Sequence, residues 1–313
     1  MVRKLAYGVV VVLLIGAAAF WILTAPQKLD DTVLASLRPG DPVKGEQVFW
    51  AAGCASCHAA PGATGEARKV LSGGYELASD FGTFVVPNIS PSPQGIGGWT
   101  LADFANALLR GVGRNGEHLY PAFPYTSYTH MKPQDVADLF AYIRTLPPSA
   151  HVPPPHRIGF PFDIRRGLGL WKRLYLTGKP AVELPGASEQ VRRGQYLVEA
   201  LGHCGECHTP RNAIGGLDKS RWLAGALSPE TGRDGKRGIV PNITTGEGGI
   251  GDWSEKDIAY ALQSGFTPDY DSLGGQMADV VTNMAHLTDA DRAAIAAYLK
   301  AVPPHPNGYP AAR

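Results

Sequence analysis

The longest apolar run of the chain lies at its start. Residues 5–25 contain no charged side chain, and Arg3 and Lys4 precede them. A helix of about 20 apolar residues matches the hydrocarbon thickness of a bilayer. A cleaved signal peptide is the alternative, but its apolar core is shorter, and Leu23 stands where its cleavage site would need a small residue. We therefore expect residues 1–26 to form an uncleaved membrane anchor.

The two basic residues also predict how the anchor is oriented. Positively charged residues beside a membrane helix stay on the cytoplasmic side. No later stretch of the sequence is apolar over a spanning length. We expect a single-pass protein of the bacterial inner membrane whose other residues lie in the periplasm, with the lipid bilayer as the partner of the N-terminal helix.

Beyond residue 40, apolar residues recur at helical spacing in segments that form pairs. One pair begins with capping boxes, Thr100 with Asp103 and Ser254 with Asp257, and both members end at a glycine. The predicted helices cover residues 44–50 and 193–199, 100–111 and 254–265, and 132–143 and 288–299. Strand patterns are nearly absent, so the chain is predicted to be mainly α-helical.

Short phrases also return between these helices. Asn88 follows Val-Pro and precedes Trp99 by eleven residues, and Asn242 follows Val-Pro and precedes Trp253 by the same interval. A matching interval with a capped helix after each copy indicates duplication of a whole fold. We predict a first domain at residues 41–149, a linker at 150–187 and a second domain at 188–305.

The predicted linker contains a basic amphipathic segment. Prolines and glycines at its start are typical of a surface connection. One hypothesis is that the segment rests on anionic lipid or on a protein partner. The other, which we favour, is that its apolar side packs on both domains and braces them. The segment comprises Arg165, Arg166, Leu168, Leu170, Trp171, Lys172, Arg173, Leu174 and Tyr175.

Composition and the common catalytic motifs exclude several classes of function. Formal net charge is +1 and charged residues make up 18% of the chain, so nothing indicates a nucleic-acid partner. The sequence has no nucleophile motif, phosphate-binding loop or flavin fingerprint. We expect no catalytic residues, and an electron-transfer subunit rather than an enzyme in its own right.

All four cysteines lie in two copies of Cys-x-x-Cys-His. Two thiols at this spacing can each take one vinyl group of a porphyrin, and the histidine that follows can then bind the iron. A zinc knuckle or a redox dithiol is the alternative, but neither requires histidine directly after each second cysteine. We predict two covalently bound haem c groups, on Cys54, Cys57 and His58 and on Cys204, Cys207 and His208.

The order of these features resembles class I cytochrome c, twice over. Each copy runs through a first helix, a haem motif, a glycine-rich loop, a middle helix, a methionine-containing loop and a last helix. The resemblance implies a fold of two tandem class I cytochrome c domains plus one N-terminal transmembrane helix. It also implies that the carbonyls of Pro87 and Pro241 orient the haem-binding histidines, since each precedes the repeated asparagine.

The sixth iron ligand is predicted to be methionine in each domain. Met131 stands directly before the last helix of the first domain, where class I cytochromes place this ligand, with the adjacent His130 as its competitor. In the second domain Leu287 falls opposite Met131, and the choice lies between Met277 and Met284. We favour Met277, which follows two glycines, because Met284 shares the helical spacing of core residues.

One arginine is a further candidate for cofactor binding. Arg211 follows the second haem motif closely, and a guanidinium group matches the geometry of a haem propionate. A solvated surface arginine is the equally weighted alternative.

Residues 193–212, which include the second haem motif, resemble the cytochrome c subunits of membrane-bound bacterial dehydrogenases of the alcohol, aldehyde and gluconate type. The similarity covers most of residues 41–304, including the Phe160-Pro161-Phe162 stretch, and in that family the Gly-Gly-Gln-Met phrase is consistent with Met277 as a ligand. The chain departs from many relatives in having two haem motifs rather than three, and an apparent anchor.

This resemblance implies electron transfer from a dehydrogenase partner to quinone, another cytochrome or a terminal oxidase. Two other hypotheses remain. In the first, the chain is the dihaem subunit of a haem-copper oxidase. In the second, it is a dihaem peroxidase or thiosulfate-oxidising cytochrome, which would need one labile distal ligand.

Overall fold

The computed structural model describes residues 2–232 and 234–309 of the chain. Helices dominate it, which confirms the predicted fold class, and two small antiparallel sheets accompany them. The first half contains α1 Val2–Leu23, α2 Asp31–Ser36, α3 Pro42–Ala51, α4 Cys54–His58, η1 Gly65–Lys69, β1 Glu76–Ser79, β2 Gly82–Val85, α5 Leu101–Arg110, α6 Tyr125–Tyr128 and α7 Pro133–Ile143. The second half contains β3 Arg157–Ile158, η2 Arg165–Gly167, α8 Leu168–Tyr175, α9 Glu189–Gln195, the π-helix η3 Tyr196–Leu201, α10 Gly205–His208, η4 Lys219–Arg221, β4 Ala226–Leu227, β5 Ile239–Val240, α11 Glu255–Ser264, α12 Met277–Met284 and α13 Asp289–Ala301.

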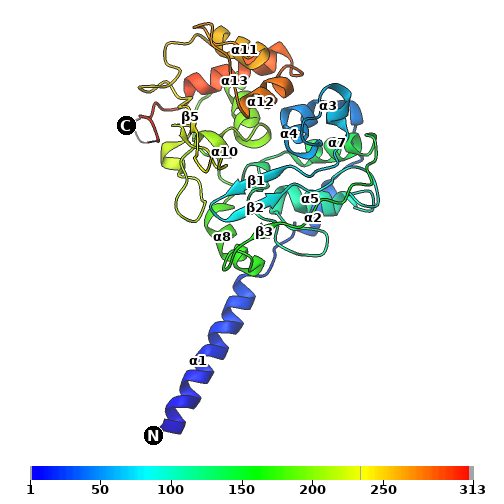
Figure 1. Cartoon of the computed structure of the whole chain (residues 1–313), viewed down its shortest axis with the longest axis vertical. Helices are drawn as coiled ribbons and strands as arrows, with labels where there is room; N and C mark the ends of the chain where they lie inside the picture. The colour runs from blue at the N-terminus through cyan, green and yellow to red at the C-terminus, as the bar shows by residue number, and fades with distance from the viewer. Residues whose placement is uncertain (1, 233, 310–313) are drawn as a thin grey trace.

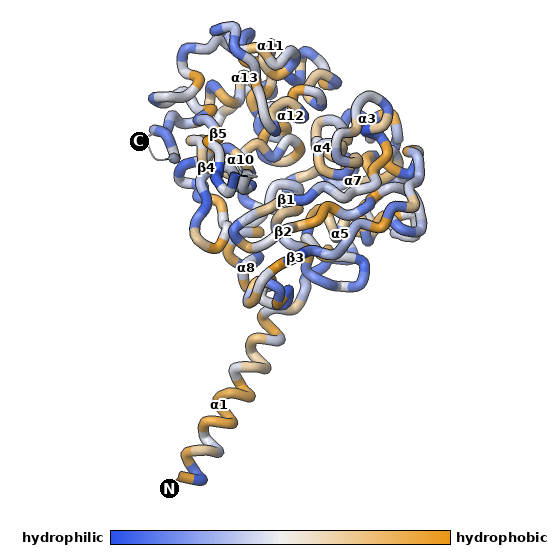
Figure 2. The backbone as a smooth tube through the Cα atoms, viewed as in Figure 1, coloured by the Kyte–Doolittle hydropathy of each residue, from blue (hydrophilic) through white to orange (hydrophobic). Residues whose placement is uncertain are grey.

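Helix α1 projects from one end of the molecule as an isolated rod (Figure 1). None of its residues is buried, and its surface is apolar along most of its length (Figure 2). Its 22 residues span about 33 Å at 1.5 Å per residue. Within the described part of the chain, α1 is the one helix long and apolar enough to cross a membrane.

The rest of the chain folds as two modules built on the same helix crossing. In the first module α3 packs against α7, and in the second α9 packs against α13. A Cβ atom on Gly45 would overlap the backbone carbonyl of Asp138, and one on Gly194 would overlap that of Ala294. Glycine at each crossing therefore lets two backbones approach more closely than any side chain would permit.

The middle helices of the two modules begin and end alike. Thr100 and Asp103 form a capping box at the start of α5, and Ser254 and Asp257 form one at the start of α11. Each helix ends at a glycine with a left-handed backbone conformation, as its sequence predicts. Five of the six predicted helices are present with shifts of one or two residues at their ends. The helix predicted at residues 193–199 begins four residues earlier as α9, and its second half continues as the π-helix η3.

The two small sheets were not predicted from the sequence. Strands β1, β2 and β3 form one antiparallel sheet, and β4 pairs with β5 in the other. These strands are two to four residues long, too short for a clear alternation of polar and apolar side chains. Because β3 lies in the predicted linker, the linker is tied to the first module by the pairing of Arg157 with Thr83.

The middle of the linker forms α8, which contacts both modules. Lys172 donates from Nζ to the carbonyls of Arg110 and Gly111, at 2.8 and 2.6 Å, at the end of α5. Trp171 donates to the Ile214 carbonyl of the second module at 2.8 Å. Helix α8 therefore lies between the modules and bonds to each of them.

Candidate haem-attachment sites

Both Cys-x-x-Cys-His motifs form short helices. Cysteines three residues apart lie on one helix face, so Cys54 with Cys57 and Cys204 with Cys207 can reach one planar group. None of the four is in a disulfide bond. Burial raises the pKa of Cys54 and Cys204 to about 12. A redox dithiol needs the opposite shift, so these thiols do not resemble that alternative.

Each motif histidine is oriented by a proline carbonyl. The Nδ1 atom of His58 lies 2.9 Å from the Pro87 carbonyl oxygen, and that of His208 lies 2.8 Å from the Pro241 carbonyl oxygen. Since a carbonyl can only accept, Nδ1 carries the proton and Nε2 keeps its lone pair. Burial lowers the pKa of His58 to about 4, so its ring is neutral at ordinary pH.

The repeated asparagines hold the loops that carry these prolines. Asn88 is buried and donates to the carbonyls of Ser149 and His151, at 2.9 and 2.8 Å, beyond the last helix of its module. Asn242 donates in the same way to the carbonyl of His305 at 2.8 Å. The asparagine therefore ties the proline loop to the segment that closes each module.

The candidate methionines have different surroundings. Met131 and Met284 are buried in the hydrophobic core, whereas Met277 is half-buried at the first position of α12. An isolated bridge pairs Val112 with His118 in the first module, and Phe266 with Ser272 in the second. Phe123 lies five positions after His118 in the first module, and Met277 lies five positions after Ser272 in the second. Met131 and Met277 therefore occupy places that are not equivalent in the repeat, and the ligand roles predicted for them remain predictions.

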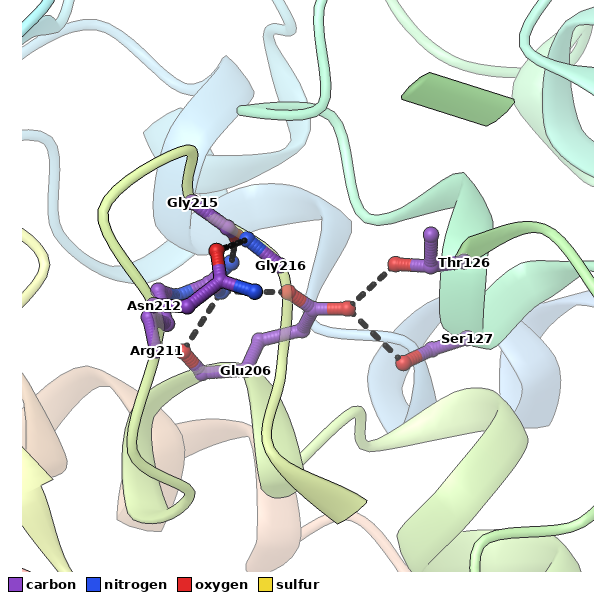
Figure 3. Close-up of polar contacts among 7 residues, drawn as sticks. All are labelled: Thr126, Ser127, Glu206, Arg211, Asn212, Gly215 and Gly216. Carbon is purple, nitrogen blue, oxygen red and sulfur yellow. Dashed lines mark hydrogen bonds and ion pairs between the residues drawn. The ribbon is translucent and has the colours of Figure 1, made fainter. Parts of the chain in front are cut away.

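Arg211 is bound within the protein to the second haem motif. Its guanidinium group lies 2.5 Å from a carboxylate oxygen of Glu206, the third residue of that motif, and also donates to the Glu206 carbonyl at 2.8 Å. It donates further to the Gly215 carbonyl at 2.8 Å (Figure 3). These partners hold the side chain beside the motif, and its predicted role toward a propionate stays a prediction.

Glu206 also connects the second motif to the first module. Its other carboxylate oxygen accepts hydrogen bonds from Thr126 at 2.7 Å and Ser127 at 3.2 Å, both from α6 (Figure 3). Burial raises the pKa of this carboxyl group, but Arg211, the Thr126 hydroxyl group and His203 together outweigh it, and the net shift is downward. Glu206 is therefore a buried, ionised carboxylate that joins the two modules.

The first motif makes the reciprocal contact. Ser56, the third residue of that motif, accepts a hydrogen bond of 2.6 Å from Asn283 of α12 in the second module. Asn283 directly precedes Met284, as Ser127 directly precedes Tyr128 in the first module. The first haem motif therefore contacts α12 of the second module, and the second motif contacts α6 of the first module. Both helices lie in the part of their module that contains the candidate methionine ligands.

Further contacts bring charged groups of the second module toward the first motif. Arg68 forms an ion pair of 2.5 Å with Asp279, and Tyr75 donates to Glu230 at 2.9 Å. Burial, followed by the charges of Glu230 and Cys207, raises the pKa of Cys57 to about 12. These contacts and those of Ser56 and Glu206 place both motifs at the boundary between the modules.

The donor sets fit a covalent haem better than a metal knuckle. Across residues 2–232 and 234–309, no group of three or more His, Cys, Asp or Glu side chains gathers in a way that could hold a metal ion. Each motif instead offers two unpaired thiols and a neutral imidazole whose Nε2 is available. These are the groups that a covalently attached haem requires.

Sequence reasoning missed the residues that join the modules. Glu206 and Ser56 occupy the variable third position of the haem motif, which carries no pattern of its own. The one available signal was a charged residue inside an otherwise small and apolar motif. Arg68 lies in the short 3₁₀ helix η1, and nothing in the sequence indicates its partner in the second module.

Comparison with known proteins agrees with this geometry. The cytochrome c family model matches residues 42–147. A protein described as "Diheme cytochrome c-type" from Cereibacter sphaeroides is 58% identical over 303 residues, which cover 96% of this chain and 98% of that protein. The chain belongs to the cytochrome c family.

Two further relatives are subunits of dehydrogenases. The fructose dehydrogenase cytochrome subunit of Gluconobacter japonicus is 38% identical over 88% of this chain. The cytochrome c subunit of the quinone alcohol dehydrogenase of Gluconobacter oxydans is 36% identical over 85% of it. The chain matches only 55% of the length of each of these two proteins. It is thus a c-type cytochrome related to dehydrogenase cytochrome subunits, and its general role is electron transfer.

Proposed function

We propose that this protein is a membrane-anchored, periplasmic dihaem cytochrome that takes single electrons from a dehydrogenase and passes them to quinone, another cytochrome or a terminal oxidase. The relatives that serve fructose and alcohol dehydrogenases support a dehydrogenase as the partner. The isolated apolar helix α1 supports the anchor, and its basic N-terminal residues support the periplasmic side.

In this proposal the two motifs hold two haems. The cysteines would hold the porphyrins as thioethers, and His58 and His208 would bind the irons through Nε2, because Nδ1 is bonded to a proline carbonyl. Bound haem supplies an iron that changes reversibly between the ferric and ferrous states. The protein itself holds the imidazoles in one tautomer and surrounds the motifs with apolar residues that exclude water.

Methionine sulfur would complete each iron site. We assign Met131 to the first haem and Met277 to the second, with Met284 as the alternative. A thioether ligand favours ferrous iron and raises the reduction potential, which suits transfer toward an oxidase. Six-coordinate iron at both sites is the property of a carrier rather than of a peroxidase.

The observation that carries the proposal is the reciprocal contact between the two haem motifs and the opposite modules. Ser56 binds Asn283, and Glu206 binds Thr126 and Ser127. Both motifs therefore lie at the contact between the modules, which is the arrangement that transfer of an electron from one bound haem to the other would require.

Purification of the full-length protein from membranes tests the function. A tagged chain extracted in mild detergent is expected to bring a dehydrogenase with it, and that enzyme's substrate is expected to reduce the bound haem. Co-purification with copper and haem b would instead favour the oxidase subunit. Turnover of peroxide or thiosulfate by the isolated chain, with no partner present, would contradict the carrier function.

A further inference from the structure

The last turn of α1 is held by side chains from the rest of the molecule. Arg166 donates to the Trp21 carbonyl, Arg173 donates to the Leu23 carbonyl at 2.7 Å, and His118 Nε2 lies 2.8 Å from the Thr24 carbonyl oxygen. We call Arg166, Arg173 and His118 the anchor socket. Carbonyls at a helix end have no partner within the helix, and positive charge there also interacts favourably with the helix dipole.

The socket fixes the anchor closely to α8. Arg166 also lies over the Trp21 ring at 4.0 Å and donates to the Thr24 hydroxyl at 2.9 Å. Gly169 of α8 is so close to Thr24 that a Cβ atom there would overlap the Thr24 backbone. The end of α1 therefore meets α8 through packing as well as through hydrogen bonds, and α8 lies at the point where α1 leaves the molecule (Figure 1).

Several large apolar side chains near the socket in sequence are exposed. Phe160 is 81% exposed and Leu174 is 62% exposed. We call the exposed apolar side chains of this region the apolar rim; they are Phe160, Phe162, Ile164, Leu170 and Leu174. The rim residues flank Arg166 and Arg173 of the socket in sequence, and Leu170 and Leu174 share α8 with Arg173. A cluster of this kind marks a surface that contacts another apolar phase.

We propose that the apolar rim docks in the interfacial layer of the same bilayer that α1 spans. This inference rests on the membrane anchor of the proposed function. Trp21 and the socket arginines lie at the end of the apolar helix, where membrane proteins place aromatic and basic residues. Helix α8, which carries two of the rim residues, packs on the end of α1, so a spanning α1 brings it to the headgroup region. Exposed phenylalanine and leucine side chains bind there by burial of apolar surface.

The basic side chains near the rim suit an anionic lipid surface, but they are already bonded within the protein, which limits how much they add to lipid binding. Arg166 and Arg173 each bind a carbonyl of α1, and Lys172 is buried against the end of α5. Arg173 is exposed as a whole and can still meet a lipid phosphate. We therefore expect the rim to dock mainly through its apolar side chains, with a smaller increase on anionic lipid.

A docked rim would fix how the haem modules stand on the membrane. A single helix alone would let the modules swing about its end, whereas two attachments beside each other define one face. The haem modules would then present the same surface to every membrane-bound partner.

Photolabelling of the full-length protein in lipid nanodiscs tests the inference. The probe is a phospholipid that carries a diazirine just below its headgroup, in discs of phosphatidylcholine with and without phosphatidylglycerol. The wild-type protein is expected to be labelled in α1 and in residues 159–175. A Phe160→Ser and Leu174→Ser variant is expected to lose labelling of residues 159–175 about tenfold, a ratio that corresponds to about 1.4 kcal/mol, while α1 stays labelled.

A matched variant controls for unspecific labelling. Tyr270 is 95% exposed and lies in sequence between α11 and α12. These two helices lie at the end of the molecule away from α1 (Figure 1). Tyr270→Ser is expected to leave labelling of residues 159–175 unchanged. Labelling of α1 without labelling of residues 159–175 would overturn the docking while the anchor stands, and would indicate that the rim meets protein or water. Absence of labelling from α1 as well would overturn the membrane anchor and the docking together.

Discussion

A buried carboxylate in the second haem motif is one of the polar links between the modules. Glu206 is 7% exposed and binds Arg211 on one side and two hydroxyl groups of α6 on the other. Removing one partner of a buried ion pair leaves an uncompensated charge. The stability lost in this way is larger than the net stabilisation that the intact pair provides. The residue thus matters for the alignment of the modules although it touches no haem ligand directly.

Glu206→Gln is expected to lower the free energy of unfolding by about 2–4 kcal/mol. The amide keeps the shape of the side chain but leaves the Arg211 guanidinium without its counter-charge. Chemical denaturation followed by haem absorbance measures the change. Glu76→Gln serves as the control because the ion pair of Glu76 with Arg157 is exposed, and exposed pairs contribute little. Equal effects of the two changes would contradict the role given to Glu206.

The same residue predicts a dependence of stability on pH. The pKa of Glu206 is lower in the folded protein than its ordinary value of about 4.3. A lowered folded pKa contributes stability that is fully present above the unfolded value and is lost as the pH falls through the folded one. The stability difference between the wild type and Glu206→Gln should therefore narrow as the pH falls below about 4.3. A difference that stays constant down to the acid transition would show that Glu206 is not ionised.

The methionines are the residues whose roles are most open to a direct test. Met131→Leu and Met277→Leu are each expected to remove one component of the near-infrared sulfur-to-iron band and to lower one haem potential by at least about 60 mV, a tenfold change in a one-electron equilibrium. Met284→Leu is the matched control in the second module. Loss of the band with Met284→Leu rather than Met277→Leu would reverse the assignment of the second ligand.

At the scale of elements, the sequence predicts the helices that occur in both modules and the helices that begin with a capping box. The middle helices could be predicted from the capping boxes at Thr100 and Ser254 and from the glycines that end them. Caps and hydrophobic periodicity are local features of the sequence. The haem motifs are equally local. Contacts between distant segments were not predictable, such as Asn283 on Ser56 or the pairing of β3 with β2, because no single segment carries both partners.

Glycines at the helix crossings give a prediction at this scale. Gly45→Ala and Gly194→Ala are each expected to lower the free energy of unfolding by about 3 kcal/mol, because the added Cβ meets backbone of the facing helix, which cannot rotate away. Denaturant midpoints measure the effect. Gly238→Ala is the control, since a Cβ there meets nothing within 4 Å. A Gly45→Ala protein as stable as the control would show that α3 and α7 cross elsewhere.

At the scale of the whole molecule, the anchor helix and the two modules are joined through α8. Helix α8 bonds to the end of α5, to a loop of the second module and to the last turn of α1. The sequence indicated its amphipathic character but not its third contact, because the carbonyls at the end of α1 carry no sequence signal. The arrangement connects the anchor to both modules through one short helix.

Electron transfer through this protein depends above all on two covalently attached haems in each chain. The most direct measurement is the haem content of the full-length protein after denaturation, from its pyridine haemochrome spectrum together with its intact mass. We expect both methods to give two haem c groups for each polypeptide, and one in a variant with Cys204→Ala and Cys207→Ala. A wild-type protein with one covalent haem, or with none, would contradict the account.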